Sequence, residues 1–232
     1  MKTIGLIGGM SWESSATYYR LINEGMKQRL GGHHNARSVM VTVSFEAIKA
    51  LQHDARWDAL GEQMAAAARQ LQAGGADFVA LCTNTMHQVA DHIERAIDIP
   101  FLHIVDPTGE ALQRAHIRKA ALLGTRFTME QDFYRSRMQM RYGIELLTPS
   151  AEDRTVVHDV IYEELCHGIV TQSSRAAYQR IIASLADQGA EAVILGCTEI
   201  MLLIGPDDVA LPVFDTTGLH ADAAVSWALR SC

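Results

Sequence analysis

Gly75–Thr83 (GADFVALCT) and Gly189–Thr198 (GAEAVILGCT) decide the fold, because they are two versions of one pattern. Each stretch has a glycine turn, a short apolar run and a cysteine followed by threonine. The second carries one extra residue, Gly196, so that Cys82 and Cys197 lie 115 positions apart in a chain of 232 residues. A repeat at about half the chain length predicts duplication of one structural unit. The alternative is a chance likeness between two common α/β patterns.

A second repeat supports duplication. Leu6–Ser11 (LIGGMS) returns as Leu122–Phe127 (LLGTRF), and Gly8 then corresponds to Gly124, 116 positions later. Because both repeats have nearly the same offset, we expect two similar halves.

Strand-like and helix-like segments alternate along the whole chain, which is typical of parallel α/β sheets. Short apolar runs that suit buried strands lie at Thr3–Gly8, Ser38–Ser44, Asp77–Leu81, Phe101–Ile104, Lys119–Gly124, Glu145–Thr148, Ala192–Leu195 and Pro212–Asp215. Amphipathic stretches that suit helices lie at Ser14–Leu30, Ala55–Ala73 and Ser173–Gln188. We therefore predict an α/β protein with two pseudo-symmetric three-layer α/β/α domains and mostly parallel sheets. Residues 1–100 with 212–232 would form the first domain and residues 101–211 the second.

Composition narrows the classes of function. The chain has 27 acidic and 20 basic residues, a net charge of −7, and no basic stripe, which argues against nucleic acid as a partner. Its first apolar run is short and rich in glycine, unlike a signal peptide or membrane span. We expect a cytoplasmic protein that does not bind membranes. The glycines of that run also lack the spacing of a dinucleotide-binding loop.

The four cysteines, Cys82, Cys166, Cys197 and Cys232, are isolated from one another in sequence. They form no C-x-x-C pair, so the sequence predicts neither a metal site nor a disulfide framework. Cys166 is expected to pack as an apolar residue, and Cys232 is expected to be a bystander.

Cys82 and Cys197 each follow an apolar strand and precede a polar turn. This is the carboxyl end of a parallel strand, where α/β proteins bind ligands and where helix N-termini favour anions such as carboxylates. The same field should lower the pKa of a thiol.

Two thiols from matched halves suit the inversion of a stereocentre. Racemisation through a planar carbanion needs a base on one face and an acid on the other, and the two roles swap in the reverse direction. If the halves face each other across a cleft, the thiols would flank one substrate carbon, roughly 6–7 Å apart. Hydrogen-bond donors for the substrate carboxylate would be Thr83, Asn84, Thr85 and Thr198. The same residues suit helix N-caps, and the two roles can coexist.

At these residues the chain resembles the aspartate/glutamate racemase family, and in particular its bacterial broad-specificity branch. The resemblance covers essentially the whole chain and is carried by Ile4–Ser14 (IGLIGGMSWES), Leu81–His87 (LCTNTMH), Leu122–Met129 (LLGTRFTM) and Leu195–Ile200 (LGCTEI).

The resemblance implies an α-amino acid as the substrate, an active site in the cleft between the two domains, a homodimer, and no metal or cofactor. It implies that the catalytic residues are Cys82 and Cys197. The implied substrate contacts are Met10, Ser11, Thr83, Asn84, Thr85, Thr125, Thr198 and Glu199.

Two departures from relatives bear on the substrate. Gly9-Met10-Ser11 and Cys197-Thr198-Glu199 replace the Asp-Ser-Gly and Cys-Thr-His motifs of glutamate racemases. Where some aspartate racemases place cations for the substrate side chain, this chain has Gln52 and Cys166-His167. We therefore expect aspartate and glutamate or a broader polar set.

Two alternatives stay open for the function. One is a related enzyme such as a hydantoin racemase, maleate isomerase or arylmalonate decarboxylase, and the other is an amino-acid-binding protein without activity. Retention of both thiols favours inversion of a stereocentre. His87 either tunes the Cys82 thiol or is structural, and His103 and His220 are expected to be structural.

Overall fold

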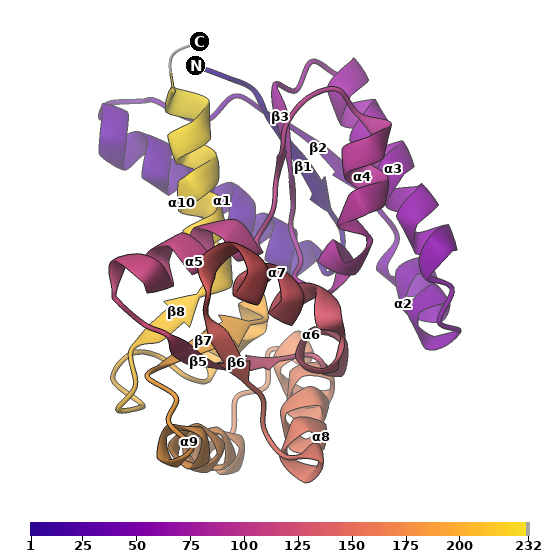
Figure 1. Cartoon of the computed structure of the whole chain (residues 1–232). Helices are drawn as coiled ribbons and strands as arrows, with labels where there is room; N and C mark the ends of the chain where they lie inside the picture. The colour runs from indigo at the N-terminus through magenta and orange to yellow at the C-terminus, as the bar shows by residue number, and fades with distance from the viewer. Residues whose placement is uncertain (231–232) are drawn as a thin grey trace. The chain divides into compact units, whose positions relative to one another are not determined.

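The computed structural model describes residues 1–230, so Cys232 lies outside the described part. The chain separates into two compact units, each built around a four-stranded parallel sheet (Figure 1). Unit 1 comprises residues 1–104 and the segment from His220 onward, and unit 2 comprises Val105–Leu219.

The sheet of unit 1 has the strand order β2-β1-β3-β4. Its strands are β1 (Ile4–Gly8), β2 (Ser38–Thr42), β3 (Phe78–Leu81) and β4 (Phe101–Leu102). Its helices are α1 (Trp12–Leu30), α2 (Phe45–His53), α3 (Trp57–Ala73), the 3-10 helix η1 (Thr85–Val89), α4 (Ala90–Ala96) and most of α10 (Thr216–Leu229).

The sheet of unit 2 has the order β6-β5-β7-β8, which is the same topology. Its strands are β5 (Lys119–Gly124), β6 (Glu145–Leu147), β7 (Ala192–Gly196) and β8 (Val213–Asp215). Its helices are α5 (Val105–Arg114), α6 (Arg126–Glu130), α7 (Asp132–Tyr142), α8 (Ala151–Asp159), the π-helical turn η2 (Val160–Glu164), η3 (Leu165–His167), α9 (Gln172–Asp187) and η4 (Thr198–Leu202).

Both units have three layers. In unit 1, Ile7 and Leu81 pack with α2, α3 and α4, whereas Leu6 and Ala80 pack with α1 and α10 on the other face. In unit 2, α8 and α9 cover the face that carries Leu123, and α5 and α7 contact the sheet at β8 and β6 (Figure 1). The central strands are buried on both faces, which explains their continuous apolar sequences.

The eight predicted strands are present, with ends that differ by at most two residues. The predicted α/β class and the similarity of the two halves are confirmed. The helix expected at Ala55–Ala73 begins at Trp57, and α2 before it was not predicted.

The unit boundaries differ from the expected ones at two places. β4 pairs with β3, so residues 101–104 belong to unit 1 and not to the second domain. β8 pairs with β7, so residues 212–219 belong to unit 2 and not to the first domain. Local sequence revealed the strands but not their pairing partners.

No helix in the described part of the chain is long and apolar enough to cross a membrane.

Candidate active site

Cys82 and Cys197 lie at equivalent edges of the two sheets. The Cys82 N–H donates to the Ile7 carbonyl at 2.9 Å, at the point where β3 ends. Cys197 follows β7 and is the N-terminal flanking residue of η4. Cys82 has 0% exposure within the core of unit 1, whereas Cys197 is half-buried against the core of unit 2.

The expected lowering of the thiol pKa values is wrong. Burial raises the pKa of Cys82 well above its usual range. Burial also raises the pKa of Cys197, and the charge of Glu199 and its hydrogen bond raise it further. Desolvation of the thiolate thus outweighs the favourable field at the start of a short helix, and both thiols hold their protons at neutral pH.

In unit 1, the first loop and the Cys82 turn are joined by hydrogen bonds. The Ser11 hydroxyl accepts from the Ser14 N–H at 3.2 Å and thereby caps α1. The Ser14 hydroxyl donates to the Cys82 carbonyl at 3.1 Å. These bonds link Ser11 to the Cys82 turn, and Met10, which precedes Ser11, is buried in the same core cluster as Met86 of η1.

Gln52 reaches the same turn from α2. Its side chain is buried, and its Nε2 donates to the Met86 sulfur at 3.3 Å. Met86 lies in η1, which follows Thr83 and Asn84 and begins at Thr85. The seven predicted site residues of unit 1 therefore lie in one turn or next to it, and they are Met10, Ser11, Gln52, Cys82, Thr83, Asn84 and Thr85.

In unit 2, the Cys197 thiol donates a hydrogen bond to the Glu199 carboxylate at 2.9 Å. The Thr198 hydroxyl accepts from the Thr217 hydroxyl at 3.5 Å. Thr125 caps α6 by accepting from the Thr128 N–H at 3.4 Å. Because Gly124 pairs with Gly196, Thr125 and Cys197 follow neighbouring strands at the same edge, and this set contains the remaining predicted residues.

Three further residues of unit 2 were not predicted. Burial raises the pKa of Tyr162 to about 12, and the nearby Cys197, Cys166 and Glu199 side chains contribute to this increase. Nothing in the motifs pointed to Tyr162, because it lies on the π-helical turn η2.

Asp215 and Thr216 lie beside Leu195, near the end of β7. The Thr216 hydroxyl donates to the Leu195 carbonyl at 2.9 Å. The Asp215 carboxylate accepts from the Thr217 and Gly218 N–H groups, both at 3.0 Å, while burial raises its pKa. Asp215 ends a predicted strand and Thr216 follows it, and this position was the available signal.

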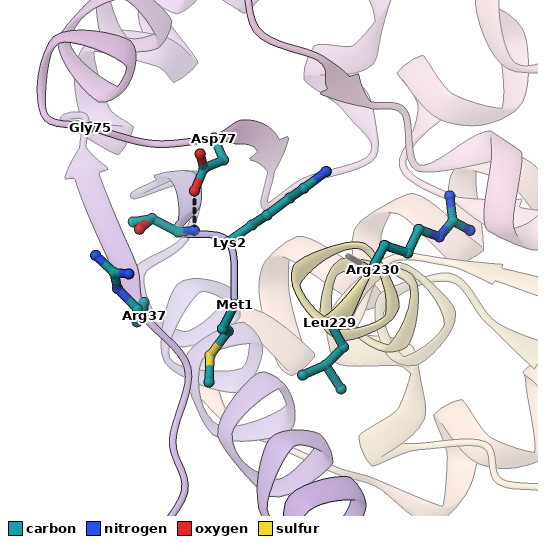
Figure 2. Close-up of a pocket in the computed structure, with 8 residues that line it drawn as sticks. Met1, Lys2, Arg37, Gly75, Asp77, Leu229 and Arg230 are labelled. Atoms are coloured by element: carbon teal, nitrogen blue, oxygen red, sulfur yellow. Dashed lines mark hydrogen bonds between the residues drawn. The ribbon is translucent and has the colours of Figure 1, made fainter. Parts of the chain in front are cut away.

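A hollow of about 410 Å³ lies elsewhere on unit 1 and is lined by Lys2, Arg37 and Asp77, among others (Figure 2). These residues precede β1, β2 and β3, so the hollow lies at the amino ends of the strands, opposite to the edge that carries Cys82. Residues 1–230 contain no group of three or more His, Cys, Asp or Glu side chains placed to hold a metal ion.

Comparisons with known proteins identify the family. The profile of the Asp/Glu/hydantoin racemase family matches residues 7–224. The broad specificity amino-acid racemase RacX of Bacillus subtilis is 22% identical over 96% of each chain. A Yersinia pestis structure assigned to the Asp/Glu racemases is 49% identical, with a TM-score of 0.94, over 99% of this chain and 100% of that one.

The aspartate racemase homologue of Pyrococcus horikoshii is 31% identical, with a TM-score of 0.87, over the same shares of the two chains. The family profile covers both cysteine turns and all the strands of both sheets except Ile4–Leu6 of β1. The chain therefore belongs to the Asp/Glu/hydantoin racemase family of enzymes.

Proposed function

We propose that this enzyme interconverts the L- and D-enantiomers of an α-amino acid by a two-base mechanism in which Cys82 and Cys197 act on opposite faces of Cα. The observation that carries the proposal is the equivalence of the two thiols, each directly after the third strand along the chain in sheets of identical order. Because both thiols are protonated at neutral pH, one of them must first lose its proton, and the Glu199 carboxylate can accept that of Cys197. The resulting thiolate removes the Cα proton and becomes a thiol. The opposite thiol then donates its proton to the carbanion and becomes a thiolate.

The raised pKa values suit this task. A thiolate with high proton affinity is a stronger base toward a weakly acidic Cα–H than an ordinary thiolate. The Cys197 proton is already directed at the Glu199 carboxylate, which provides a place for that proton when Cys197 acts as the base. Cys82 acts from a fully buried position, where water competes least for its proton.

The substrate carboxylate must be stabilised as the neighbouring carbon gains negative charge. Thr83, Thr85 and Thr198 lie at the starts of η1 and η4, where hydroxyls and backbone N–H groups suit an anion. We propose Met10, Ser11, Asn84, Thr125 and Glu199 as the further substrate contacts. Gln52 offers a neutral amide for the substrate side chain, which favours aspartate, glutamate or a broader polar set.

The proposal is tested by incubating the protein with each proteinogenic amino acid in heavy water without pyridoxal phosphate. Chiral chromatography and mass spectrometry then measure inversion and Cα deuteration. We expect both from either enantiomer of at least one polar amino acid. Binding of an amino acid without deuteration would contradict the proposal and support a binding protein.

A second test does not depend on finding the substrate. The mechanism requires the two sulfurs to lie about 6–7 Å apart when they flank one carbon. A short bifunctional alkylating reagent such as 1,3-dibromoacetone should then form one thioether with each sulfur, with loss of two bromide ions and of the two thiol protons. Peptide mapping that finds Cys82 and Cys197 only singly alkylated would count against the two-thiol site.

We also propose that the protein acts in the cytoplasm as a homodimer. Exposed apolar side chains of Trp12, Tyr19 and Met40 lie beside β2, at the edge of the unit 1 sheet. Such a patch favours burial against a partner. Light scattering should give twice the mass of the chain, and Met40→Glu should shift the protein toward the monomer. A monomeric parent protein would overturn the proposed dimer.

A further inference from the structure

A group of buried histidines lies in unit 1 beside the Cys82 turn. His87, His103 and His220 have exposures of 2%, 3% and 0%. The ring centre of His87 is 4.5 Å from that of His103 and 5.9 Å from that of His220. Buried imidazoles in contact favour neutral rings, because nearby positive charges would repel one another in an apolar setting. The arrangement of their hydrogen bonds can therefore be assigned.

His87 bridges two backbone groups in a single tautomer. The Ile104 N–H donates to its Nε2 at 3.1 Å, so Nε2 carries the lone pair. Its Nδ1 lies 2.7 Å from the Thr83 carbonyl, which can only accept. The neutral ring therefore carries its proton on Nδ1 and donates to Thr83.

His220 is held by the opposite tautomer. Its Nε2 lies 2.9 Å from the Leu102 carbonyl and donates to it. Its Nδ1 lies 2.8 Å from the Tyr18 hydroxyl and accepts from it. Ile104 ends the first segment of unit 1 and His220 begins the second, so a buried histidine is hydrogen-bonded at each place where the chain passes between the units.

The bond to Thr83 fixes a direction in the turn that follows Cys82. The peptide that joins Thr83 to Asn84 is planar and trans, so its C=O and N–H groups point in opposite directions. Holding the Thr83 carbonyl against His87 therefore aims the Asn84 N–H away from the histidine. The Ser14 hydroxyl holds the preceding carbonyl, that of Cys82, so that two consecutive peptide groups have fixed orientations.

We infer that His87 is a positioning residue that holds the Cys82–Thr83 turn in its catalytic geometry through the Thr83 carbonyl and the Ile104 N–H. This inference rests on the proposed racemase function for its effect on turnover. The sequence pattern alone left open whether His87 tunes the thiol or is structural. The bridge indicates that it acts through the backbone of the turn.

The test compares two variants of His87. His87→Gln keeps one donor and one acceptor at about the spacing of the ring nitrogens, whereas His87→Phe keeps the ring shape and removes both. Peptide-resolved alkylation with iodoacetamide measures each thiol separately. We expect His87→Phe to increase the alkylation rate of Cys82 at least about tenfold and to leave Cys197 unchanged, because the turn opens locally. His87→Gln should stay within about threefold of the parent.

Turnover gives the second readout. Displacement of a catalytic group by about 1 Å costs on the order of 100-fold in rate. His87→Phe should therefore lower kcat by about 10- to 100-fold with a smaller change in KM, and His87→Gln should restore most of kcat. If His87→Phe does not fold, His87→Asn replaces it, because Asn retains the donor near Nδ1 and is too short to reach Ile104. It should show an intermediate effect.

His220→Phe is the matched control, because it removes the ring nitrogens of another histidine in the same buried group and leaves the bond from His87 to Thr83 in place. An equal increase in Cys82 alkylation in this control would overturn the inference, as would equal behaviour of His87→Phe and His87→Gln. If the parent protein racemises no amino acid, the proposed function fails. The alkylation comparison still decides whether His87 holds the turn.

Discussion

The two units share one sheet topology but differ in the connections that carry the site. In unit 1, three residues separate β1 from α1 (Gly9–Ser11), and three separate β3 from η1 (Cys82–Asn84). In unit 2, the corresponding connections are Thr125 alone and Cys197 alone. The extra Gly196 extends β7 to five residues, against four in β3. The two halves thus share the positions of the thiols but differ in the turns that surround them.

The chemical surroundings of the thiols differ as well. Burial alone raises the pKa of Cys82, whereas Cys197 also faces the Glu199 carboxylate and the Cys166 side chain. The Cys82 turn is held by neutral groups, Ser14 and His87, and the Cys197 thiol is held by a charged one. Equivalent places in the fold therefore do not give equivalent acids and bases.

Removal of either thiol should have the largest effect on activity, and it tests the difference between the two thiols. Cys82→Ser and Cys197→Ser should each lower racemisation by about 10²- to 10⁴-fold, because each deletes one of the two proton-transfer groups. Each variant should still exchange the Cα proton of one enantiomer, and the two variants should favour opposite enantiomers. Deuterium incorporation into separate L and D samples measures this. Parental racemisation rates in both variants would exclude the two-thiol mechanism.

The longer first loop of unit 1 depends on Gly9. Its φ is +98°, and an added Cβ would lie 2.2 Å from the Val43 carbonyl oxygen. Gly9→Ala should destabilise unit 1 by about 1–3 kcal/mol from backbone strain, with the clash in addition. Hydrogen exchange of the β1 amides, compared with that of β5, measures the effect. Thr125 occupies the equivalent position after β5, because it follows Gly124 as Gly9 follows Gly8. Thr125→Gly is the control, since it changes the same position in the other unit. Equal exchange of β1 in Gly9→Ala and the parent would contradict this explanation of the loop.

The sequence was sufficient to predict the fold because its signals were local and repeated. Each strand was an apolar run between glycine or polar turns, and the two cysteine motifs marked equivalent strand ends. The unit boundaries depended on β4 and β8, whose partners lie far away in sequence. Such pairing cannot be read from a three-residue run such as Val213–Asp215.

Site residues that lie within the motifs were predicted, whereas a residue that tertiary packing brings to the site was missed. The cysteines and threonines of the two turns stood out by position. Tyr162 did not, because it reaches Cys197 from a π-helical turn in another segment. The predicted direction of the thiol pKa shifts was also wrong, because the extent of burial depends on the tertiary structure. Adjacency to a helix start is visible in the sequence, but desolvation is not.

Neutralising Glu199 should make the two thiols more alike. Its negative charge destabilises the Cys197 thiolate, so Glu199→Gln should lower the pKa of Cys197 and move its alkylation profile toward lower pH. At a fixed pH below that pKa, the alkylation rate follows the thiolate fraction, which rises about tenfold when the pKa falls by one. The Cys82 profile should not move.

Racemisation by Glu199→Gln should instead fall by about tenfold or more, because the proton of Cys197 loses its acceptor. Glu163→Gln is the control, since Glu163 is exposed and carries the same charge. An unchanged Cys197 profile in Glu199→Gln would show that the hydrogen bond does not govern this thiol.

The smallest expected effects concern the two helix caps, Ser11 in unit 1 and Thr125 in unit 2. Each hydroxyl accepts from an N–H three residues later, so Ser11→Ala and Thr125→Ala should each cost about 1 kcal/mol of local stability, or roughly fivefold in opening. Exchange rates of the Ser14 and Thr128 amides measure this cost, and Asn at either position should largely restore the cap. If the hydroxyls also bind substrate, KM will rise in the Ala variants and remain high in the Asn variants. Unchanged amide exchange with raised KM would instead leave substrate binding as the only role of the two hydroxyls. A different result at the two positions would show that the caps, like the thiols, differ between the units.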